Sequence, residues 1–264
     1  MDNLRTFVIA MAGKGGTGKT TISALLIRYL LNKNLLPVLV VDADANANLN
    51  ELLGLKVERT LGQVRDEMKT AVPAGMTKET YIEYKMQEAL IESKGFDLLI
   101  MGQPEGPGCY CAANNLLAKY LEILTRNYRI VIVDNEAGME HLSRLNLREI
   151  DVLISVSDPG PRGIMTAKRI ADLTTHLDVQ VGEKVLIVNR TPNGLDPVLR
   201  EEISKSGLVL GGTIRQDALL AAYELKKLSF LDLPAESAAV QDAEAIFDAL
   251  IRGKLNAQSS RYGN

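Results

Sequence analysis

Short apolar runs alternate with longer amphipathic segments along this chain. Runs rich in Val, Ile and Leu predict buried strands, and apolar residues at three- and four-residue spacing predict helices between them. The predicted strands are Thr6–Ala12, Pro37–Val41, Phe96–Met101, Ile130–Val133, Val152–Val156, Lys184–Val188 and Leu208–Ile214. The predicted helices are Thr20–Leu31, Ala112–Thr125, Glu140–Arg148, Arg162–His176, Pro197–Lys205, Asp217–Leu225 and Ala239–Ile251.

This alternation predicts an α/β fold with three layers, in which helices cover both faces of a mostly parallel central sheet. The chain shows no repeat, low-complexity tract or linker, so we expect residues 1–264 to form a single domain. Residues 49–93 fit the alternation least well. Their segments LGQVRDEM and KETYIEYKMQEALIE predict a helical insertion between the second and third predicted strands. The polar tail, at about 256–264, is expected to be flexible.

Composition narrows the choice of partners. The chain has 264 residues, of which 46% are hydrophobic and 24% charged, and its net charge is −3. This charge offers no basic surface for a phosphate backbone, so nucleic acid is not an expected partner. The first residues, MDNLRTFVIAMAG, hold too short an apolar run for a signal peptide, and no segment reaches the length of a membrane span. We therefore predict a cytoplasmic protein without a membrane partner.

A glycine-rich loop carries the strongest chemical signal. The run Gly13-Lys14-Gly15-Gly16-Thr17-Gly18-Lys19-Thr20 follows the first predicted strand and opens the first predicted helix, which is the setting of a P-loop. Its glycines allow backbone N–H groups to cradle phosphates, Lys19 reaches the β- and γ-phosphates, and the Thr20 hydroxyl binds Mg²⁺. The loop predicts a P-loop NTPase that binds a nucleotide.

Carboxylates follow two of the predicted strands. Asp42 and Asp44 come after the second strand, where carboxylates beside a P-loop hold Mg²⁺-bound waters or polarise the attacking water. Capping of the next helix is the alternative role for these acids. Asp134 and Glu136 follow the strand Ile130–Val133, and the role of Glu136 stays open.

The stretch KGGTGKTT resembles the deviant Walker A family of ATPases, which includes nitrogenase iron protein, the Min and Par positioning ATPases and metal-centre maturation factors. The resemblance implies an ATP-sandwich homodimer in which Lys14 contacts nucleotide phosphates across the interface; a solvated loop lysine is the alternative. It also implies that Lys14, Lys19 and Asp44 are catalytic, with Asp44 orienting the hydrolytic water, and that Asp42 lies in the Mg²⁺ shell. The nucleotide-binding residues that it implies in this loop are Gly13, Lys14, Gly15, Gly16, Thr17, Gly18, Lys19, Thr20 and Thr21.

The same resemblance extends to two later motifs. Asp134-Asn135-Glu136-Ala137-Gly138 looks like a Walker B aspartate followed by switch II, which implies that Asp134 binds Mg²⁺ through water and that the Gly138 N–H senses the γ-phosphate. Asn189 matches the asparagine that hydrogen-bonds adenine in this family. An asparagine in an ordinary turn is the alternative.

The two cysteines of the chain are Cys109 and Cys111, in a loop rich in glycine and proline. Two cysteines cannot form a disulfide framework, and two thiolates are soft ligands for a thiophilic metal. One pair supplies only two of the four ligands of a closed site. If an ATP dimer brings two such loops together, four thiolates converge on one Ni²⁺, or on Zn²⁺ in vitro; small residues in a turn are the alternative reading.

Together, the deviant Walker A loop, CYCAANN and EAGMEHLSR resemble the CooC-type ATPases that mature nickel-dependent carbon monoxide dehydrogenase, and the related factor for acetyl-CoA synthase. The resemblance implies an ATPase that uses ATP, Mg²⁺ and Ni²⁺ and assists nickel insertion into a client of either kind. Two alternatives stay open: a MinD- or ParA-like positioning ATPase, and an iron-protein-like reductase with an Fe–S cluster between subunits. Neither His141 nor His176 is assigned to the metal.

Overall fold

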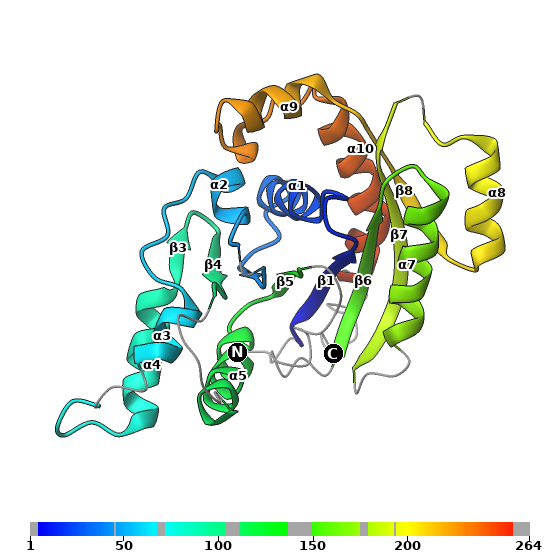
Figure 1. Ribbon diagram of the computed structural model, residues 1–264. Coiled ribbons are helices and arrows are strands. Elements are labelled where there is room, and N and C mark those ends of the chain that lie inside the picture. Colours follow the sequence, from blue (N-terminus) through cyan, green and yellow to red (C-terminus); the bar gives the residue numbers. More distant parts are fainter. Residues whose placement is uncertain are drawn as a thin grey trace, which may run out of the picture.

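The structure of the chain is a computed structural model (Figure 1). It describes residues 5–44, 46–67, 72–103, 111–136, 149–174, 179–192 and 194–255, with the backbone alone for residues 111–117. The predicted helix Glu140–Arg148 and both histidines lie outside these ranges. No helix in the described part of the chain is long and apolar enough to cross a membrane.

The described strands form one eight-stranded sheet in the order β3-β4-β2-β5-β1-β6-β7-β8. Every strand pair is parallel except the β3–β4 pair at one edge. The predicted α/β architecture is therefore confirmed. The strands are β1 (Phe7–Gly13), β2 (Val38–Asp42), β3 (Ile91–Ser93), β4 (Phe96–Ile100), β5 (Ile130–Asp134), β6 (Glu149–Ser157), β7 (Gln180–Thr191) and β8 (Val209–Arg215).

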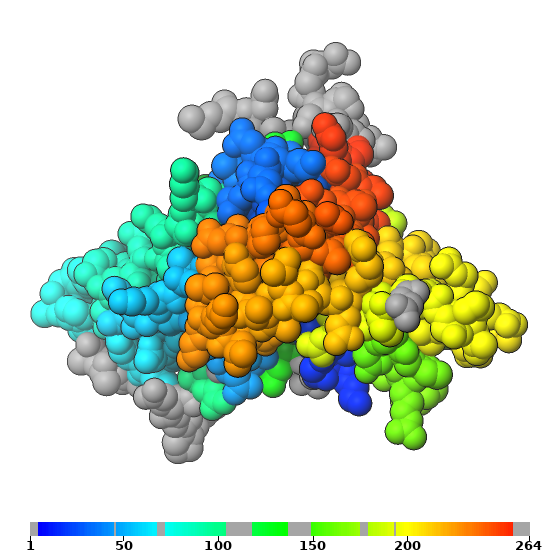
Figure 2. Space-filling model, turned by 90° about the horizontal axis from the view of Figure 1, so that it is seen from above, coloured from blue at the N-terminus to red at the C-terminus, as the bar shows by residue number. Residues whose placement is uncertain are grey.

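Helices lie on both faces of this sheet (Figure 1). They are α1 (Lys19–Asn32), α2 (Leu49–Leu53), α3 (Leu61–Glu67), α4 (Lys78–Ala89), α5 (Cys111–Thr125), α7 (Pro161–Leu173), α8 (Pro197–Ser206), α9 (Ala218–Leu225) and α10 (Ala238–Phe247). A 3₁₀ turn (Phe230–Asp232) precedes α10, and a π-helical turn (Asp248–Arg252) follows it. In Figure 2, α9 lies in the centre of the upper face, between the regions of α2 and α8.

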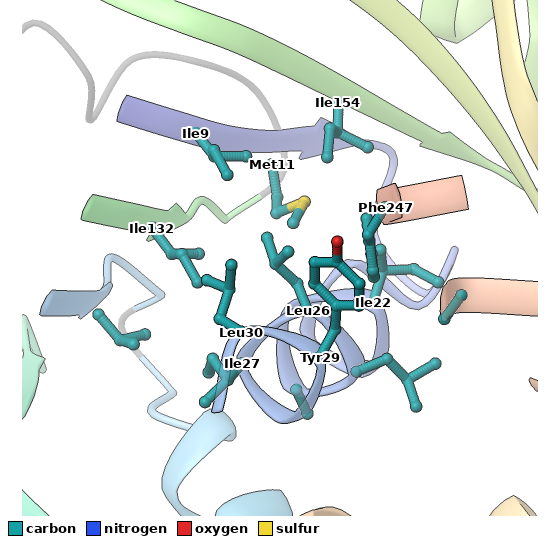
Figure 3. Close-up of a cluster of buried hydrophobic side chains, with 14 of the residues drawn as sticks. Ile9, Met11, Ile22, Leu26, Ile27, Tyr29, Leu30, Ile132, Ile154 and Phe247 are labelled. Carbon is teal, nitrogen blue, oxygen red and sulfur yellow. The ribbon is translucent and has the colours of Figure 1, made fainter. Parts of the chain in front are cut away.

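Alternate residues of β1 belong to different apolar clusters, as strand geometry requires. Ile9 and Met11 face α1 and α10, and they pack with Tyr29 and Phe247 (Figure 3). Val8 and Ala10 face the opposite side, where α3, α4 and α5 supply the apolar side chains. Because both faces of β1 are covered, the strand is buried along its whole length and fixes the loop that follows it.

The insertion departs from its prediction. Residues 78–92 were expected to be helical throughout, but α4 ends at Ala89 and Ile91–Ser93 form β3. This three-residue strand pairs antiparallel with β4, so a tertiary contact determines its conformation. The expectation of helices alone between the second and third predicted strands was therefore wrong at this point.

Candidate nucleotide site

The carboxyl ends of the parallel strands meet at one edge of the sheet, and the P-loop lies there between β1 and α1. Strands β1 and β6 are neighbours, and the chain continues from β1 to β2 on one side and from β6 to β7 on the other. Such a reversal of direction between adjacent parallel strands places a crevice at this edge. A Cβ on Gly13 would lie 2.4 Å from the Val156 carbonyl oxygen, so the loop begins in close contact with β6. The site is thus centred on the strand that the sequence predicts.

Side chains of the loop fold back onto its own carbonyl groups. The Lys19 Nζ donates to the carbonyl oxygens of Gly13 and Lys14, at 3.3 Å each. The Thr17 hydroxyl donates to the same Lys14 oxygen at 2.9 Å. Lys19 is 8% exposed, whereas Lys14 is exposed at the rim. The two lysines therefore differ in setting: Lys19 organises its own loop, and Lys14 faces outward.

Charge is concentrated around the Lys19 ammonium. Burial lowers the pKa of Lys19, and the carboxylates of Asp134, Asp44 and Glu136 offset part of this decrease. A buried cation at the mouth of a phosphate-sized loop is suited to receive the oxygens of an anionic ligand.

Asp42 lies beneath the loop that leaves β2. Its Oδ1 accepts a hydrogen bond from the backbone N–H of Asp44 at 3.0 Å, and its Oδ2 accepts one from Leu49 at 3.2 Å. Burial raises the pKa of Asp42 to about 6, and the backbone hydrogen bonds offset part of the increase. Both oxygens thus hold the loop in place. Asp44 itself lines the cavity in front of the P-loop, and its Oδ1 accepts from the Asn46 N–H at 2.8 Å.

Asp134, at the end of β5, is a stronger candidate than Asp42 for a metal ligand. Its side chain is 1% exposed, and neither oxygen has a hydrogen-bond partner of ordinary geometry in the described part of the chain. Burial, and then the Asp42 carboxylate, raise the pKa of Asp134 to about 7, although the hydroxyls of Thr20 and Ser23 lie close enough to lower it. A hydrated Mg²⁺ would supply the missing partners, so these residues fit the ion.

Asn189 and Arg190, near the end of β7, contact the P-loop from the side. The Asn189 Nδ2 donates to the Thr17 carbonyl oxygen, and the Arg190 Nη1 donates to the Gly16 carbonyl oxygen, both at 2.9 Å. A Cβ on Gly18 would lie 2.2 Å from the Asn189 Nδ2, and Gly18 has a φ of +92°, so both the contact and the backbone favour glycine at that position. The Asn189 Oδ1 accepts from the Arg190 N–H at 2.9 Å, so within the described part of the chain one amide proton and one lone pair stay available for a further ligand.

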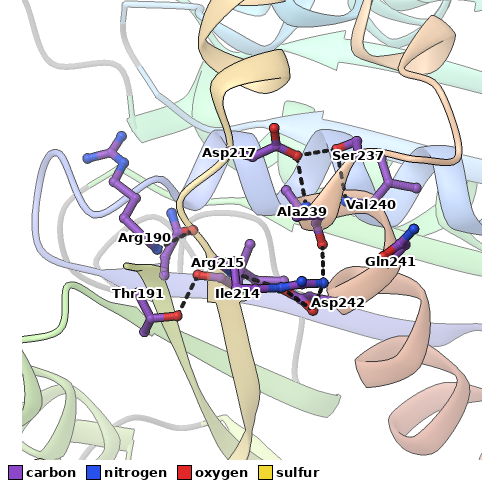
Figure 4. Close-up of polar contacts among 12 residues, drawn as sticks. Arg190, Thr191, Ile214, Arg215, Asp217, Ser237, Ala239, Val240, Gln241 and Asp242 are labelled. Atoms are coloured by element: carbon purple, nitrogen blue, oxygen red, sulfur yellow. Dashed lines mark hydrogen bonds and ion pairs between the residues drawn. The ribbon is translucent and has the colours of Figure 1, made fainter. Parts of the chain in front are cut away.

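Two cavities adjoin the loop. One, of about 500 Å³, is lined by P-loop glycines, Lys19, Asp44 and the end of α9. The other, of about 610 Å³, lies between β7, β8 and α9. Thr21, Arg190 and Glu224 line both, so the cavities are neighbours. Figure 4 shows the hydrogen-bonded group beside the second cavity, in which Asp217 joins Ser237 and Ala239 and Arg215 joins Asp242.

The structure brings together most of the predicted site residues: the P-loop, Asp42, Asp44, Asp134 and Asn189. Gly138 and Cys109 lie outside the described ranges, and Cys111 is the first residue of α5, without a described side chain. Within the described part of the chain, no group of three or more His, Cys, Asp or Glu residues is arranged to hold a metal ion.

Sequence reasoning assigned no role to three groups that the structure places at this edge. They are Arg190, the Asn135 amide, which donates to the Met11 carbonyl oxygen at 2.7 Å, and the end of α9 at Glu224, Lys227 and Leu228. Asn135 lies within the motif that resembles switch II, and this position was the one sequence signal that could have indicated a role for it. The residues at the end of α9 and in the turn after it belong to no motif. They lie far from the P-loop in sequence and approach it only in the folded chain, so no sequence signal indicated a role for them.

Comparison with known proteins agrees with this geometry. The family model of the CobQ/CobB/MinD/ParA nucleotide binding domain matches residues 8–230. The chain belongs to this family. Membership in the MinD/ParA family implies an ATP-binding ATPase, which accounts for the P-loop and its cavities.

Two relatives of this MinD/ParA-type protein align with nearly its whole length. An uncharacterized ATP-binding protein of Methanocaldococcus jannaschii is 40% identical over 253 residues, which is 94% of this chain and 100% of that protein. The carbon monoxide dehydrogenase accessory protein CooC of Rhodospirillum rubrum is 30% identical over 259 residues, 92% of this chain and 95% of that protein.

Solved structures share the fold. The septum site-determining protein MinD of Pyrococcus horikoshii, complexed with Mg-ADP, superposes with a TM-score of 0.70 at 20% identity, covering 95% of this chain and 98% of that one. A ParA family ATPase of Chlorobium tepidum gives the same TM-score and identity, with 93% and 98% covered.

Proposed function

We propose that this ATPase is a nickel metallochaperone that dimerises with nucleotide and metal and assists nickel insertion into carbon monoxide dehydrogenase or acetyl-CoA synthase. One observation carries the proposal. The only two cysteines of the chain are Cys111, the first residue of α5, and Cys109, two residues before it in sequence. Helix α5 follows the parallel strand β4, so its start is expected at the same sheet edge as the P-loop. Metal ligands at this edge can respond to the nucleotide.

The nucleotide is proposed to occupy both cavities. Its phosphates fit the cavity lined by Lys19, and its base fits the neighbouring cavity beside Asn189. Asp134 and Thr20 would hold Mg²⁺, with Asp42 nearby, and the ion would neutralise phosphate charge. Asp44 would orient the attacking water, and Gly138 would sense the γ-phosphate.

A homodimer follows from the two lysines. Because Lys14 is exposed while Lys19 is buried, Lys14 is free to reach the phosphates held by a partner subunit. A two-fold axis through this face would also bring two cysteine pairs together. Four thiolates from Cys109 and Cys111 would then enclose one ion, and opening of the dimer after hydrolysis would release it.

Similarity to CooC supports nickel as the cargo, since the two chains align over nearly their full lengths. The structure also bears on the positioning alternative. In the C-terminal segment, Ala239, Val240 and Phe247 of α10 are buried against α1 and β8, so this apolar stripe serves the core rather than a membrane surface. This burial argues against membrane attachment through α10, as in a MinD-like positioning ATPase.

Metal content tests the proposal. Anaerobically purified Asp44→Ala protein, in which turnover is stopped and both cysteines are present, should contain one ion per dimer by elemental analysis after loading with Ni²⁺ and ATP. Cys109→Ser or Cys111→Ser should each abolish tight binding, because each change removes two of four thiolates. ATP hydrolysis by the single cysteine variants should persist in part.

The outcomes separate the alternatives. One ion per monomer, or full activation of the client enzyme by Cys111→Ser, would overturn the shared site. A broad visible cluster band in the anaerobic protein would favour the reductase. A nucleotide-dependent dimer that binds no nickel would favour the positioning ATPase.

A further inference from the structure

The tip of the P-loop has almost no packing of its own. A Cβ placed on Gly15 or Gly16 would meet no atom within 4 Å, so the side-chain position of each glycine is open. Gly16 also has a φ of +81°, which is accessible to glycine without strain. Ordering consecutive glycines costs more backbone conformational entropy than ordering other residues, because glycine has the most conformational freedom to lose. The tip therefore needs a tether.

Arg190 supplies that tether from another element. Its Nη1 donates to the Gly16 carbonyl oxygen at 2.9 Å, across 174 positions of sequence. The Gly16 carbonyl shares a planar peptide unit with the Thr17 N–H, so fixing the oxygen fixes the direction of that N–H. The Thr17 N–H closes a turn on the Lys14 carbonyl oxygen at 3.4 Å. Arg190 thus holds this turn from outside.

Asn189 holds the next peptide unit in the same way. Its Nδ2 donates to the Thr17 carbonyl oxygen, and the other end of that unit is the Gly18 N–H, at the wall of the phosphate cavity. The Asn189 Oδ1 also accepts from the Arg190 N–H at 2.9 Å. This bond stabilises Arg190 in the left-handed region, at φ +58°, which is unfavourable for a residue with a Cβ. The two residues act as one clamp on successive peptide units.

The clamp differs from the bonds that Lys19 makes. Lys19 holds the Gly13 and Lys14 carbonyl groups, but its ammonium has to turn toward the phosphates when a nucleotide binds. The Arg190 side chain reaches the loop from the end of β7 and can stay in place. Figure 4 shows it extending away from the hydrogen-bonded group around Asp217 and Asp242. Arg190 also lines both cavities, so it lies between the proposed base and phosphate positions.

We propose that Arg190 is a positioning residue that tethers the tip of the P-loop through the Gly16 carbonyl and so preorganises the phosphate cradle before nucleotide binds. This inference rests on the nucleotide site of the proposed function. Arg190 acts through the loop, so its contribution is the same for any ligand that uses the loop, with or without a base.

The test compares ATP with tripolyphosphate, which has no base. Arg190→Met, which removes the donors and retains an unbranched side chain, should weaken the binding of both ligands by the same factor, roughly 3- to 10-fold, by calorimetry. Arg190→Lys restores one donor and should recover most of the affinity. The matched control is Arg200→Met, which removes an exposed arginine of α8 and should leave both affinities within about twofold.

Two further measurements separate a tether from a direct phosphate contact. A direct ion pair would make the salt dependence of binding less steep in Arg190→Met, whereas a tether predicts an unchanged slope. In the unliganded protein, backbone order parameters of Gly15 and Gly16 should fall in Arg190→Met and remain high in Arg190→Lys.

A loss of affinity confined to ATP, a changed salt slope, or unchanged order parameters would each overturn the tether. Wild-type protein that binds neither ATP nor tripolyphosphate would instead overturn the nucleotide site. The order parameters of the unliganded variants would still decide the tether in that case.

Discussion

Asp42 and Asp134 occupy paired positions on the parallel strands β2 and β5, and both are 1% exposed. Burial is the main cause that raises the pKa of each, to about 6 for Asp42 and about 7 for Asp134, and the Asp42 charge raises the latter further. Among the described residues, Asp42 accepts hydrogen bonds from two backbone N–H groups, whereas Asp134 accepts none from the backbone. The pair therefore carries a buried charge that the unliganded fold compensates only in part.

Removing the Asp134 charge should stabilise the unliganded protein at alkaline pH. The pKa of Asp134 is about 7 in the folded chain and about 4 in the unfolded chain, so the folded form binds the proton more tightly. The stability that this proton gives the folded protein is present at low pH and is lost as pH rises through about 7. Asp134→Asn should raise the free energy of unfolding by roughly 2 to 4 kcal/mol at pH 8 and have little effect at pH 4. Urea unfolding in EDTA at several pH values measures this.

The same variant provides the control for the metal. Mg²⁺ with nucleotide should stabilise wild-type protein more at pH 8 than at pH 6, because the ionised carboxylate binds the cation and the protonated one does not. Asp134→Asn should lose most of this gain. Equal stabilisation of both proteins at pH 8 would place Mg²⁺ elsewhere.

The two P-loop lysines should separate binding from dimerisation. Lys19→Ala removes the buried ammonium beside Asp134 and Asp44, and it should weaken ATP binding at least 100-fold, since charge-assisted bonds to phosphate are the strongest in such a site. Lys14→Ala should bind ATP within a few-fold of wild type but fail to form the ATP dimer. Calorimetry and sedimentation with Asp44→Ala as the background measure the two effects. If Asp44→Ala protein itself stays a monomer with ATP, as the lysine variants do, the ATP-sandwich dimer would be contradicted.

Much of the fold could be predicted because the buried parallel strands are continuous apolar runs. β1 and β5 begin and end within one residue of their predicted limits, since every residue in them is buried. β7 extends from Gln180 to Thr191, well beyond the predicted Lys184–Val188. Its polar start is held by pairing with β6, and Thr191 at its end is buried and pairs with Arg215 of β8. Apolar patterning marks where a strand is buried, and hydrogen bonding decides where it stops.

The site could be predicted only where one continuous segment carries it. The P-loop is such a segment, so Lys19 and Thr20 were recognisable. The contact of Arg190 with Gly16 joins residues 174 positions apart, and no local pattern marks an arginine for that role. The same holds for Asp42, whose strand position indicated a carboxylate at the site but did not reveal that its two oxygens hold the following loop.

Asp217 should contribute more to the free energy of unfolding than an ordinary helix cap, because its carboxylate accepts hydrogen bonds at the starts of two helices. Its Oδ1 accepts from the Leu219 N–H at the start of α9, and its Oδ2 accepts from the Ser237 hydroxyl and the Ala239 N–H at the start of α10. Although burial raises the pKa of Asp217, these hydrogen bonds together hold it below its ordinary value. Asp217→Ala should therefore lower the free energy of unfolding by about 2 to 4 kcal/mol near pH 7.

Asp196→Ala is the matched control, because Asp196 is exposed and caps α8 alone through the Val198 N–H. It should cost about 1 kcal/mol. The difference between Asp217→Ala and wild type should persist above pH 5 and narrow as pH falls below about 4, where protonation of Asp217 removes the charge that its partners stabilise. Equal losses in the two alanine variants would show that α9 and α10 are held by their apolar contacts. In that case the walls of the second cavity would not depend on the Asp217 carboxylate.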